Sequence, residues 1–173
     1  LRPLGKAEVL LRVRAVGLNF RDVLNVLGEY PGEPGPPGGD VAGVLAEAAS
    51  PPRSAFGLGH APLASVVIAM TPFLAAKPSM LSFEQACTLP VTWSTTHAVV
   101  ERAAVRSHRV IIVQAAAGGV GLKAVEYAQW LDAVPLGTAG RPHKHAQLRL
   151  TAVAGLGSSR DGAAFAMGVT RRL

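Results

Sequence analysis

A run of small residues and glycines at 113–121, Val-Gln-Ala-Ala-Ala-Gly-Gly-Val-Gly, constrains the fold of this chain more than any other stretch. Four β-branched residues at 110–113 lead into it, and an amphipathic stretch follows at 122–131. A strand, a tight glycine turn and a helix in this order are the context in which a dinucleotide-binding loop is credible. Aligned with G-x-G-x-x-G/A, the three key positions are Ala116, Gly118 and Gly121, so alanine replaces the first glycine.

Each position in this loop has a physical task. Gly118 lets the backbone approach a pyrophosphate, and Gly121 lets the helix and the strand pack closely. The free N–H groups of the first helical turn, from Gly119 and Val120 onward, then face the anion. A tight strand–helix turn in a sheet that binds no nucleotide is the alternative interpretation.

The sequence from Arg109 onward alternates between strand and helix patterns. Strands are expected at 109–115, 134–139 and 152–157, and helices at 120–132, about 143–150 and 161–171. This order predicts a parallel sheet covered by helices, and three strands make one half of a doubly wound sheet.

The earlier part of the chain predicts short strands between turns rich in proline and glycine. Strands are expected at 8–15, 41–45 and 64–69, helices at 19–27 and 92–103, and a loop at 30–39. Ser82 and Gln85 match a capping box, which predicts a short helix that runs through Cys87 and ends before Pro90.

Composition excludes several classes of protein. Hydrophobic residues make up 49% of the chain and charged residues 16%, which is typical of a packed globular protein. The apolar runs are too short for a membrane span, and the single cysteine, Cys87, excludes a disulfide framework and a cysteine-rich zinc site. The five histidines show no metal-ligand spacing, so no metal is expected.

The net charge of +6 raises the question of nucleic acid. The basic residues are mostly dispersed and aromatic residues make up only 5%, so nucleic-acid binding is not expected. The chain lacks an initiator methionine and a signal peptide, and it is expected to be a cytoplasmic segment of a longer protein.

The segment at 137–144 predicts which dinucleotide the loop selects. An NAD site usually places a carboxylate about 20 residues beyond the glycines, where it accepts from the ribose 2′-hydroxyl. This segment contains no carboxylate and offers Arg141 and Lys144. These cations attract a 2′-phosphate, so NADPH is favoured over NADH, with a solvated helix start as the alternative.

Several further segments match one family in the family's own order. They are residues 17–24, 27–32, 38–44, 81–92 and 114–121. With these motifs the chain resembles the enoyl reductase domains of modular polyketide synthases and animal-type fatty acid synthases, which belong to the medium-chain dehydrogenase/reductase superfamily and lie close to the zinc-free quinone oxidoreductases.

The resemblance implies an α/β fold in which a partial GroES-like β-barrel lobe precedes half of a Rossmann doubly wound parallel sheet. The barrel segment is expected at 1–98 and the NADP-binding half at 99–173, with a cleft between the two lobes. The stretch at 49–59 is shorter than in the family and lacks the family's Gly-Asp-Arg-Val hairpin, so the barrel is expected to lack a strand pair there.

The resemblance also implies an activity, namely NADPH-dependent reduction of an α,β-unsaturated acyl thioester carried on the phosphopantetheine of an acyl carrier protein. Hydride goes to the β-carbon and a proton to the α-carbon, and the neighbouring synthase domains are partners. Asn19 and Asp22 match residues near the nicotinamide, Tyr30 a tyrosine associated with proton delivery, and Thr95 a threonine facing the nicotinamide. Alternatively, Asn19 and Asp22 cap a short helix, and Tyr30 is a loop aromatic packed on the barrel.

Two alternatives to a synthase module stay open. One is a stand-alone zinc-free quinone oxidoreductase, and the other is a non-catalytic remnant that serves as a structural spacer. The family's lysine and aspartate proposed as proton donors lie beyond Leu173, so the isolated chain is expected to be inactive or very weak. The sequence does not identify the acyl substrate, the stereochemistry at the α-carbon or the oligomeric state.

Overall fold

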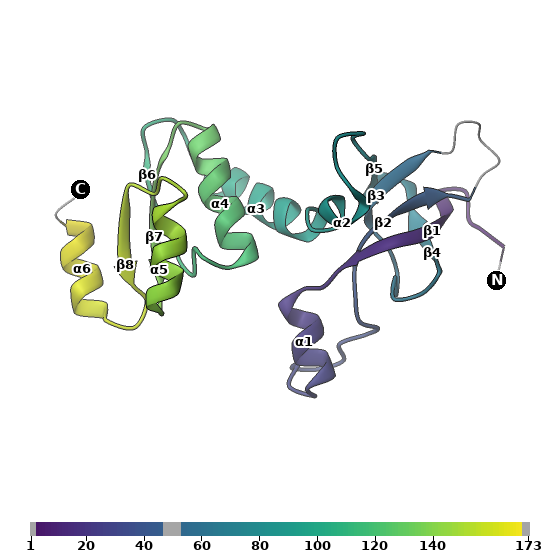
Figure 1. Ribbon diagram of the computed structural model, residues 1–173, viewed down its shortest axis with the longest axis horizontal. Helices are drawn as coiled ribbons and strands as arrows, with labels where there is room; N and C mark the ends of the chain where they lie inside the picture. The colour runs from purple at the N-terminus through teal and green to yellow at the C-terminus, as the bar shows by residue number, and fades with distance from the viewer. Residues whose placement is uncertain (1–2, 47–52, 171–173) are drawn as a thin grey trace. The chain divides into compact units, whose positions relative to one another are not determined.

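Strand pairing separates the computed structural model into two sheets, and the structure describes residues 3–46 and 53–170. The first sheet holds β1 (Glu8–Gly17), β2 (Asp40–Leu45), β3 (Ser54–Leu58), β4 (Val66–Met70) and β5 (Leu74–Ala76); the second holds β6 (Val110–Val113), β7 (Val134–Ala139) and β8 (Gly155–Ser158). The chain divides between Val91 and Thr92 into an N-terminal and a C-terminal unit, which contain one sheet each (Figure 1). The boundary expected from the sequence, at 98/99, lies further along the helix that begins at Pro90.

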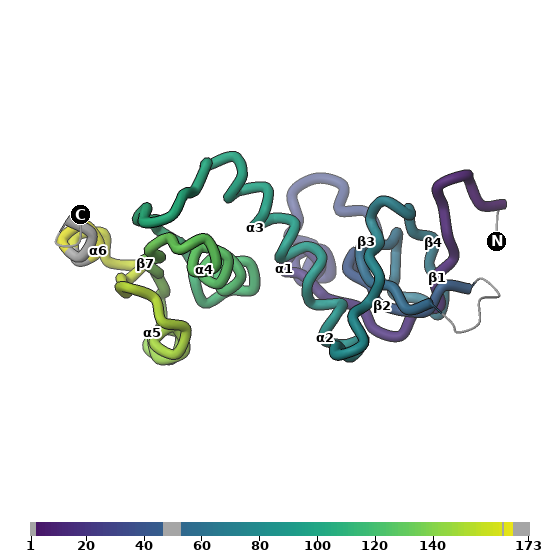
Figure 2. Tube along the Cα trace, turned by 90° about the horizontal axis from the view of Figure 1, so that it is seen from above, coloured from purple at the N-terminus to yellow at the C-terminus, as the bar shows by residue number. Residues whose placement is uncertain are grey.

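The five strands of the N-terminal unit are antiparallel and follow the order β4-β1-β2-β3-β5. The register between β1 and β2 shifts between Val13 and Ala15, and such a bulge bends and twists the strand that carries it. The sheet is accordingly curled (Figure 2). Its inner side chains form a buried cluster of Leu11, Val41, Ala55 and Val67. A partial antiparallel barrel, as the resemblance implied, is therefore confirmed.

Strand β3 lies in the stretch near 49–59 where the sequence predicted no strand. It pairs with β2 on one side and with β5 on the other, so residues 54–58 hold a strand that the sequence did not predict. That the barrel lacks a strand pair of the family near 49–59 stays a prediction. The buried positions of β3 are Ala55 and Gly57, which are too small to give an apolar alternation. Gly57 has φ +155°, and a Cβ there would clash with the carbonyl oxygen of Phe73.

Short helices follow some of these strands: α1 (Phe20–Val26) follows β1, the 3-10 helix η1 (Thr71–Phe73) follows β4, and α2 (Phe83–Ala86) follows β5. The predicted capping box is confirmed, since Gln85 N donates to Ser82 Oγ (3.1 Å) and Ser82 N donates to Gln85 Oε1 (2.9 Å). Cys87 follows α2 directly and is buried against Ala42 and Ala86. Burial raises the pKa of the Cys87 thiol, so it behaves as a small core residue.

The C-terminal unit alternates between strand and helix as the sequence predicted. Strands β6, β7 and β8 are parallel, and α4 (Gly119–Trp130), α5 (Pro142–Arg149) and α6 (Gly162–Thr170) follow them in turn. Val125 of α4 and Leu148 of α5 share one buried cluster with Val113 of β6, so these two helices cover the same face. Helix α6 lies next to β8 in Figure 1, on the side away from β7. Half of a doubly wound sheet is thus confirmed.

Helix α3 (Pro90–Arg102) and helix α4 carry a cluster of aromatic side chains in the C-terminal unit. The ring of Tyr127 stacks on Trp130 with centroids 5.3 Å apart and meets the edge of Trp93 at 5.7 Å. His97 Nδ1 lies 2.9 Å from the Tyr127 hydroxyl, so the exposed His97 side chain joins the same cluster. Of the helices within residues 3–46 and 53–170, none combines the length and apolar character that crossing a bilayer requires.

Candidate functional site

A cavity of about 420 Å³ opens at the carboxyl ends of the parallel strands, and we call it the strand-end cavity. Its lining comes from the loop after β6, from the end of β7 with the start of α5, and from the turn after β8. The lining residues are Ala115, Ala117, Gly118, Ala139, Gly140, Arg141, Lys144, Ser159 and Arg160. In open α/β sheets, ligands bind outside the carboxyl ends of the strands, and this cavity has that position.

The glycine-rich loop after β6 has the geometry that its sequence predicted. A Cβ on Gly121 would overlap the carbonyl oxygen of Ala115 and lie 2.7 Å from Ala116 Cα, so only glycine lets α4 approach the loop this closely. Ala116 is fully buried and its N–H donates to Thr138 O (2.9 Å). Gly118 is the N-cap of α4, and the N–H groups of Gly119, Val120 and Gly121 begin the helix, where an α-helix leaves its N–H groups without intrahelical acceptors.

Cationic side chains also line the strand-end cavity, from the start of α5 and from the turn after β8. Arg141 is the N-cap residue of α5 and Lys144 lies in the first turn of that helix. His145 Nε2 donates to Ala139 O (2.7 Å), which holds the end of β7 against α5. Among the residues that the structure describes, Arg160 is the third cationic side chain in the lining, and no acidic residue contributes to it. Amide donors at a helix start and a cation cluster beside them fit a phosphorylated dinucleotide.

Arg141 and Lys144 were predicted from the sequence, whereas Ser159 and Arg160 were not. The predicted third strand, 152–157, ends directly before these residues, and the observed strand β8 ends at Ser158. Because the carboxyl ends of parallel strands meet at one edge of the sheet, the polar residues after each predicted strand could have been grouped. That signal was available in the sequence.

A second cavity, of about 380 Å³, lies wholly within the N-terminal unit beside α1, and we call it the α1 cavity. Its lining comes from the start of α1 and from the loops before β2 and after β3, together with one helical residue. The lining residues are Asn19, Arg21, Asp22, Pro34, Gly35, Pro36, Gly38, Gly39, Leu58, Gly59, His60, Ala61 and Val91. Asn19 and Asp22 are therefore brought together, whereas Tyr30 is half-buried in the loop before β2 and does not contribute to the lining.

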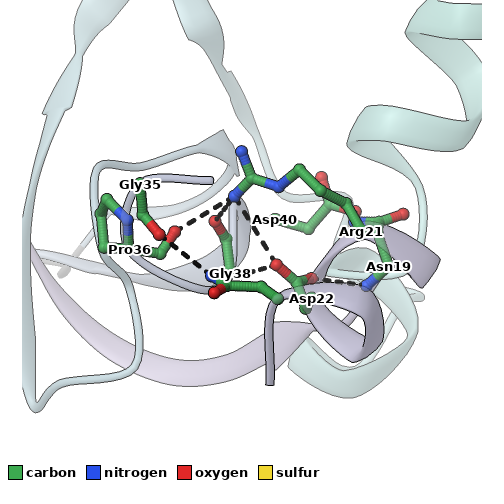
Figure 3. Close-up of polar contacts among 8 residues, drawn as sticks. Asn19, Arg21, Asp22, Gly35, Pro36, Gly38 and Asp40 are labelled. Atoms are coloured by element: carbon green, nitrogen blue, oxygen red, sulfur yellow. Dashed lines mark hydrogen bonds and ion pairs between the residues drawn. The ribbon is translucent and has the colours of Figure 1, made fainter. Parts of the chain in front are cut away.

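Asp22 is the centre of a buried polar network at the start of α1 (Figure 3). Its carboxylate accepts from Asn19 N (2.7 Å) and from Gly38 N (2.8 Å), and Arg21 Nη2 lies 3.6 Å away. Burial raises the pKa of Asp22, but the two amide donors and the Arg21 charge outweigh burial and lower it below the usual value. Asp22 is thus an ionised acceptor at neutral pH, which agrees with a capping role.

Arg21 holds the Pro/Gly-rich loop against this network. Its Nη2 donates to Pro36 O (3.1 Å) and to Gly38 O (3.2 Å), so the guanidinium spans the loop in Figure 3. The loop carbonyls and the Asp22 carboxylate therefore share one cation. This arrangement fixes one wall of the α1 cavity.

Asp40, at the start of β2, is a second buried carboxylate, and the sequence analysis did not assign it to the site. Asn19 Nδ2 donates to its Oδ2 (3.1 Å), and Val91 N donates to its Oδ1 (2.9 Å). Burial raises the pKa of Asp40 above the usual value, because the hydrogen bonds from Asn19 and Val91 only partly offset desolvation and the Asp22 charge adds to it. Asn19 thus links two carboxylates of opposite pKa shift.

We expect Asp22→Asn to lower the free energy of unfolding at pH 7 by about 1.5–3 kcal/mol, the range for hydrogen bonds to a charged group. Because its folded-state pKa is lowered, Asp22 stabilises the fold above its unfolded pKa, and the stabilisation is lost as the pH falls through the folded value. Urea unfolding at pH 7 and at pH 3, followed by circular dichroism, should show the loss at pH 7 shrinking at pH 3.

Asp40→Asn is the matched control, with an opposite pH dependence. The raised pKa of Asp40 means that its contribution is full below the unfolded pKa and declines as the pH rises through the folded value. The neutral amide removes the burial penalty, so the loss at pH 7 should be smaller than for Asp22→Asn. Equal losses for both variants at both pH values would contradict this assignment.

The structure places Thr95 on an exposed face of α3. The neighbouring Thr96 is buried, and its Oγ1 donates to Thr92 O (2.8 Å) within the helix. A contact between Thr95 and a nicotinamide stays a prediction. Within the part of the chain that the structure describes, no group of three or more metal-ligating side chains is assembled.

Comparison with known proteins relates the chain to polyketide synthases. The spectinabilin polyketide synthase system protein NorB of Streptomyces orinoci is 38% identical over 169 residues, which cover 92% of this chain and 8% of the synthase. Erythronolide synthase EryA2 of Saccharopolyspora erythraea is 37% identical over 155 residues, which cover 86% of this chain and 4% of the synthase. No protein-family model matches the chain.

The chain is also similar to solved structures of an enoyl reductase and a quinone oxidoreductase. The CurK enoyl reductase matches with a TM-score of 0.85 and 31% identity over 99% of this chain and 58% of its own. The quinone oxidoreductase of Thermus thermophilus, solved also with NADPH, matches with a TM-score of 0.79 and 34% identity over 92% and 54%. The chain therefore spans little more than half the length of these structures and less than a tenth of the two synthases.

Proposed function

Because the chain belongs to the enoyl reductase family of modular polyketide synthases, within the medium-chain dehydrogenase/reductase superfamily, we propose that it functions in an NADPH-dependent enoyl reductase module. One observation carries the choice of cofactor. The strand-end cavity brings cations and helix N–H groups together, and no acidic residue of the described part of the chain lines it.

In this proposal the C-terminal unit holds the cofactor. The backbone around Ala116 and Gly118, with the N–H groups of Gly119, Val120 and Gly121, binds the pyrophosphate. Arg141 and Lys144 bind the 2′-phosphate, and no acidic residue, which would repel it, is found among the described residues that line the cavity. The cavity at the carboxyl strand ends supports this division of roles.

The substrate would be an α,β-unsaturated acyl thioester on the phosphopantetheine of an acyl carrier protein, with neighbouring synthase domains as partners. Bound NADPH would supply a hydride to its β-carbon. Protonation at the α-carbon is assigned to Tyr30 Oη, and Thr95 is assigned to the nicotinamide end of the cofactor. A cytoplasmic location completes the proposal.

Asn19 and Asp22 act in this proposal as positioning residues in the α1 cavity. The ionised Asp22 cannot deliver a proton at neutral pH, since hydrogen bonds from two amides hold its pKa low. Instead it fixes the start of α1 and the loop at Gly38, and Asn19 ties that network to Asp40. The tyrosine is then the better candidate for proton delivery.

The proposal is tested by titrating the 173-residue chain with NADPH and NADH and measuring each Kd by calorimetry. Charge-assisted contacts of about 1.5–3 kcal/mol each should give NADPH at least a tenfold preference. Arg141→Ala and Lys144→Ala should each raise the Kd for NADPH at least tenfold and the Kd for NADH much less. Equal affinity of the wild type for both dinucleotides would overturn the selectivity.

Turnover is tested with a crotonyl thioester and the absorbance of NADPH. We expect the isolated chain to be inactive or very weak, because it spans about half of the related enoyl reductase and oxidoreductase chains. Positioning of the two reactants supplies several kcal/mol of barrier reduction, and an incomplete site forfeits much of it. Turnover of about 1–10 per second would refute this expectation.

A quinone substrate is the second candidate, favoured by the 34% identity to the Thermus quinone oxidoreductase. A chain extended to the full length of the related oxidoreductases can be assayed with both substrates. Reduction of a quinone without reduction of a thioester would favour this second candidate. A chain that binds neither dinucleotide would instead support a structural spacer.

A further inference from the structure

Arg160, which the sequence analysis did not single out, reaches the strand-end cavity from the turn after β8. We propose that Arg160 determines cofactor specificity by contacting the 2′-phosphate of NADPH together with Arg141 and Lys144. The inference rests on the proposed NADPH function and adds a residue from a third strand end to it.

Two hydrogen bonds hold the turn that carries Arg160. Ser159 N donates to Ala139 O (3.2 Å), which ties the turn to the end of β7. Arg160 N donates to Ser158 Oγ (3.1 Å), which closes the turn on itself. The backbone of Arg160 is therefore fixed relative to Gly140 and Arg141, as a residue that reads a ligand requires.

Gly140 provides the space in which the Arg160 side chain lies. A Cβ on Gly140 would be 3.0 Å from Arg160 Nε, 3.5 Å from Arg160 Cδ and 3.2 Å from Ser159 Oγ. The arginine arm thus lies across the backbone of the residue that directly precedes Arg141. It reaches the segment in which the sequence predicted selection of the 2′-phosphate.

The chemistry of the three cations favours a phosphate over other parts of the cofactor. A phosphate monoester carries a charge of about −1.5 to −2 near neutral pH, so it can be matched by more than one cation. A planar guanidinium can hold two phosphate oxygens at once, which the Lys144 ammonium cannot do. NADH has a hydroxyl at this position, so the contribution of Arg160 should be specific to NADPH.

The main test compares Arg160→Ala with the wild type for NADPH and NADH, by calorimetry on the 173-residue chain. We expect the Kd for NADPH to rise at least tenfold and the Kd for NADH to change less than twofold. Arg109→Ala is the matched control, because this exposed arginine precedes β6 at the amino edge of the sheet. The control should leave both affinities unchanged.

Gly140→Ala gives a second variant that keeps the charge and displaces the Arg160 arm. It should weaken the binding of NADPH selectively, but less than Arg160→Ala does. The Kd of Arg160→Lys for NADPH should also lie between those of the wild type and Arg160→Ala. Adenosine 2′,5′-bisphosphate and 5′-AMP, titrated in parallel, should repeat the difference without the nicotinamide half.

The outcomes separate the inference from the proposed function. A wild type that binds NADPH, with Arg160→Ala and Gly140→Ala at wild-type affinity, overturns the role of Arg160 alone. Equal weakening of NADPH and NADH overturns it as well and points to stacking of the guanidinium on the adenine. A wild type that binds neither dinucleotide overturns the proposed function and with it this inference.

Discussion

Gly118→Asp is expected to abolish NADPH binding, with a Kd at least 100-fold above that of the wild type. Gly118 is the N-cap of α4 and lines the strand-end cavity. An aspartate there would accept from the helix N–H groups that the pyrophosphate needs and would add a like charge beside it. Two like charges 4 Å apart repel by about 4 kcal/mol at an effective dielectric constant of about 20, which exceeds the roughly 2.7 kcal/mol of a 100-fold loss.

The fold should survive this substitution, because aspartate is among the preferred N-cap residues. A Cβ on Gly118 would lie 3.3 Å from Ala115 O, so the loop must yield by only a few tenths of an ångström. Gly118→Asn is the matched control, since it adds the same bulk and cap without the charge. Calorimetric titration should give Gly118→Asn a Kd for NADPH between those of the wild type and Gly118→Asp. A Kd of Gly118→Asp within threefold of the wild-type value would contradict a pyrophosphate site here.

Gly121→Ala is expected to destabilise the C-terminal unit by about 3 kcal/mol or more, whereas Gly119→Ala should be neutral or stabilising by up to about 1 kcal/mol. A Cβ on Gly121 would overlap Ala115 O and crowd Ala116 Cα. Both are backbone atoms, which cannot rotate away as a side chain can. A Cβ on Gly119 would meet only Thr92 Cγ2 at 3.5 Å, an ordinary contact. The same added methyl group, at two positions that are two residues apart in one helix, should therefore have different effects on stability.

Thermal and urea unfolding of both variants, followed by circular dichroism, check this pair. Because Gly121→Ala pushes the loop away from α4, it should also weaken the binding of NADPH. A loss of stability that is the same for both variants would mean that helix propensity, and not the approach of α4 to the loop, governs these positions.

The C-terminal unit could be predicted from sequence because its signals are local. Residues 110–113 are β-branched, the glycines follow at once, and the next strand begins after one helix. The cations at 141 and 144 directly follow the second strand, so their place at the cavity follows from parallel topology. Each inference needed only neighbouring residues and one rule about sheets.

The parts that could not be predicted depend on contacts between distant segments. Strand β3 presents Ala55 and Gly57 inward, so its place in the sheet is set by the close approach of its partners and leaves no apolar pattern. Asp40 joins the site because Asn19 and Val91 converge on it from 21 residues before and 51 residues after. No local spacing encodes such a convergence.

The aromatic cluster on α3 and α4 gives the C-terminal unit a spectroscopic reporter of its own. Both tryptophans of the chain, Trp93 and Trp130, belong to the C-terminal unit and contact Tyr127. Intrinsic tryptophan fluorescence therefore reports on that unit alone, while Tyr30 is the sole tyrosine of the N-terminal unit. Tryptophan fluorescence and far-ultraviolet circular dichroism, followed in one denaturation series, can thus resolve whether the two units unfold together or in sequence.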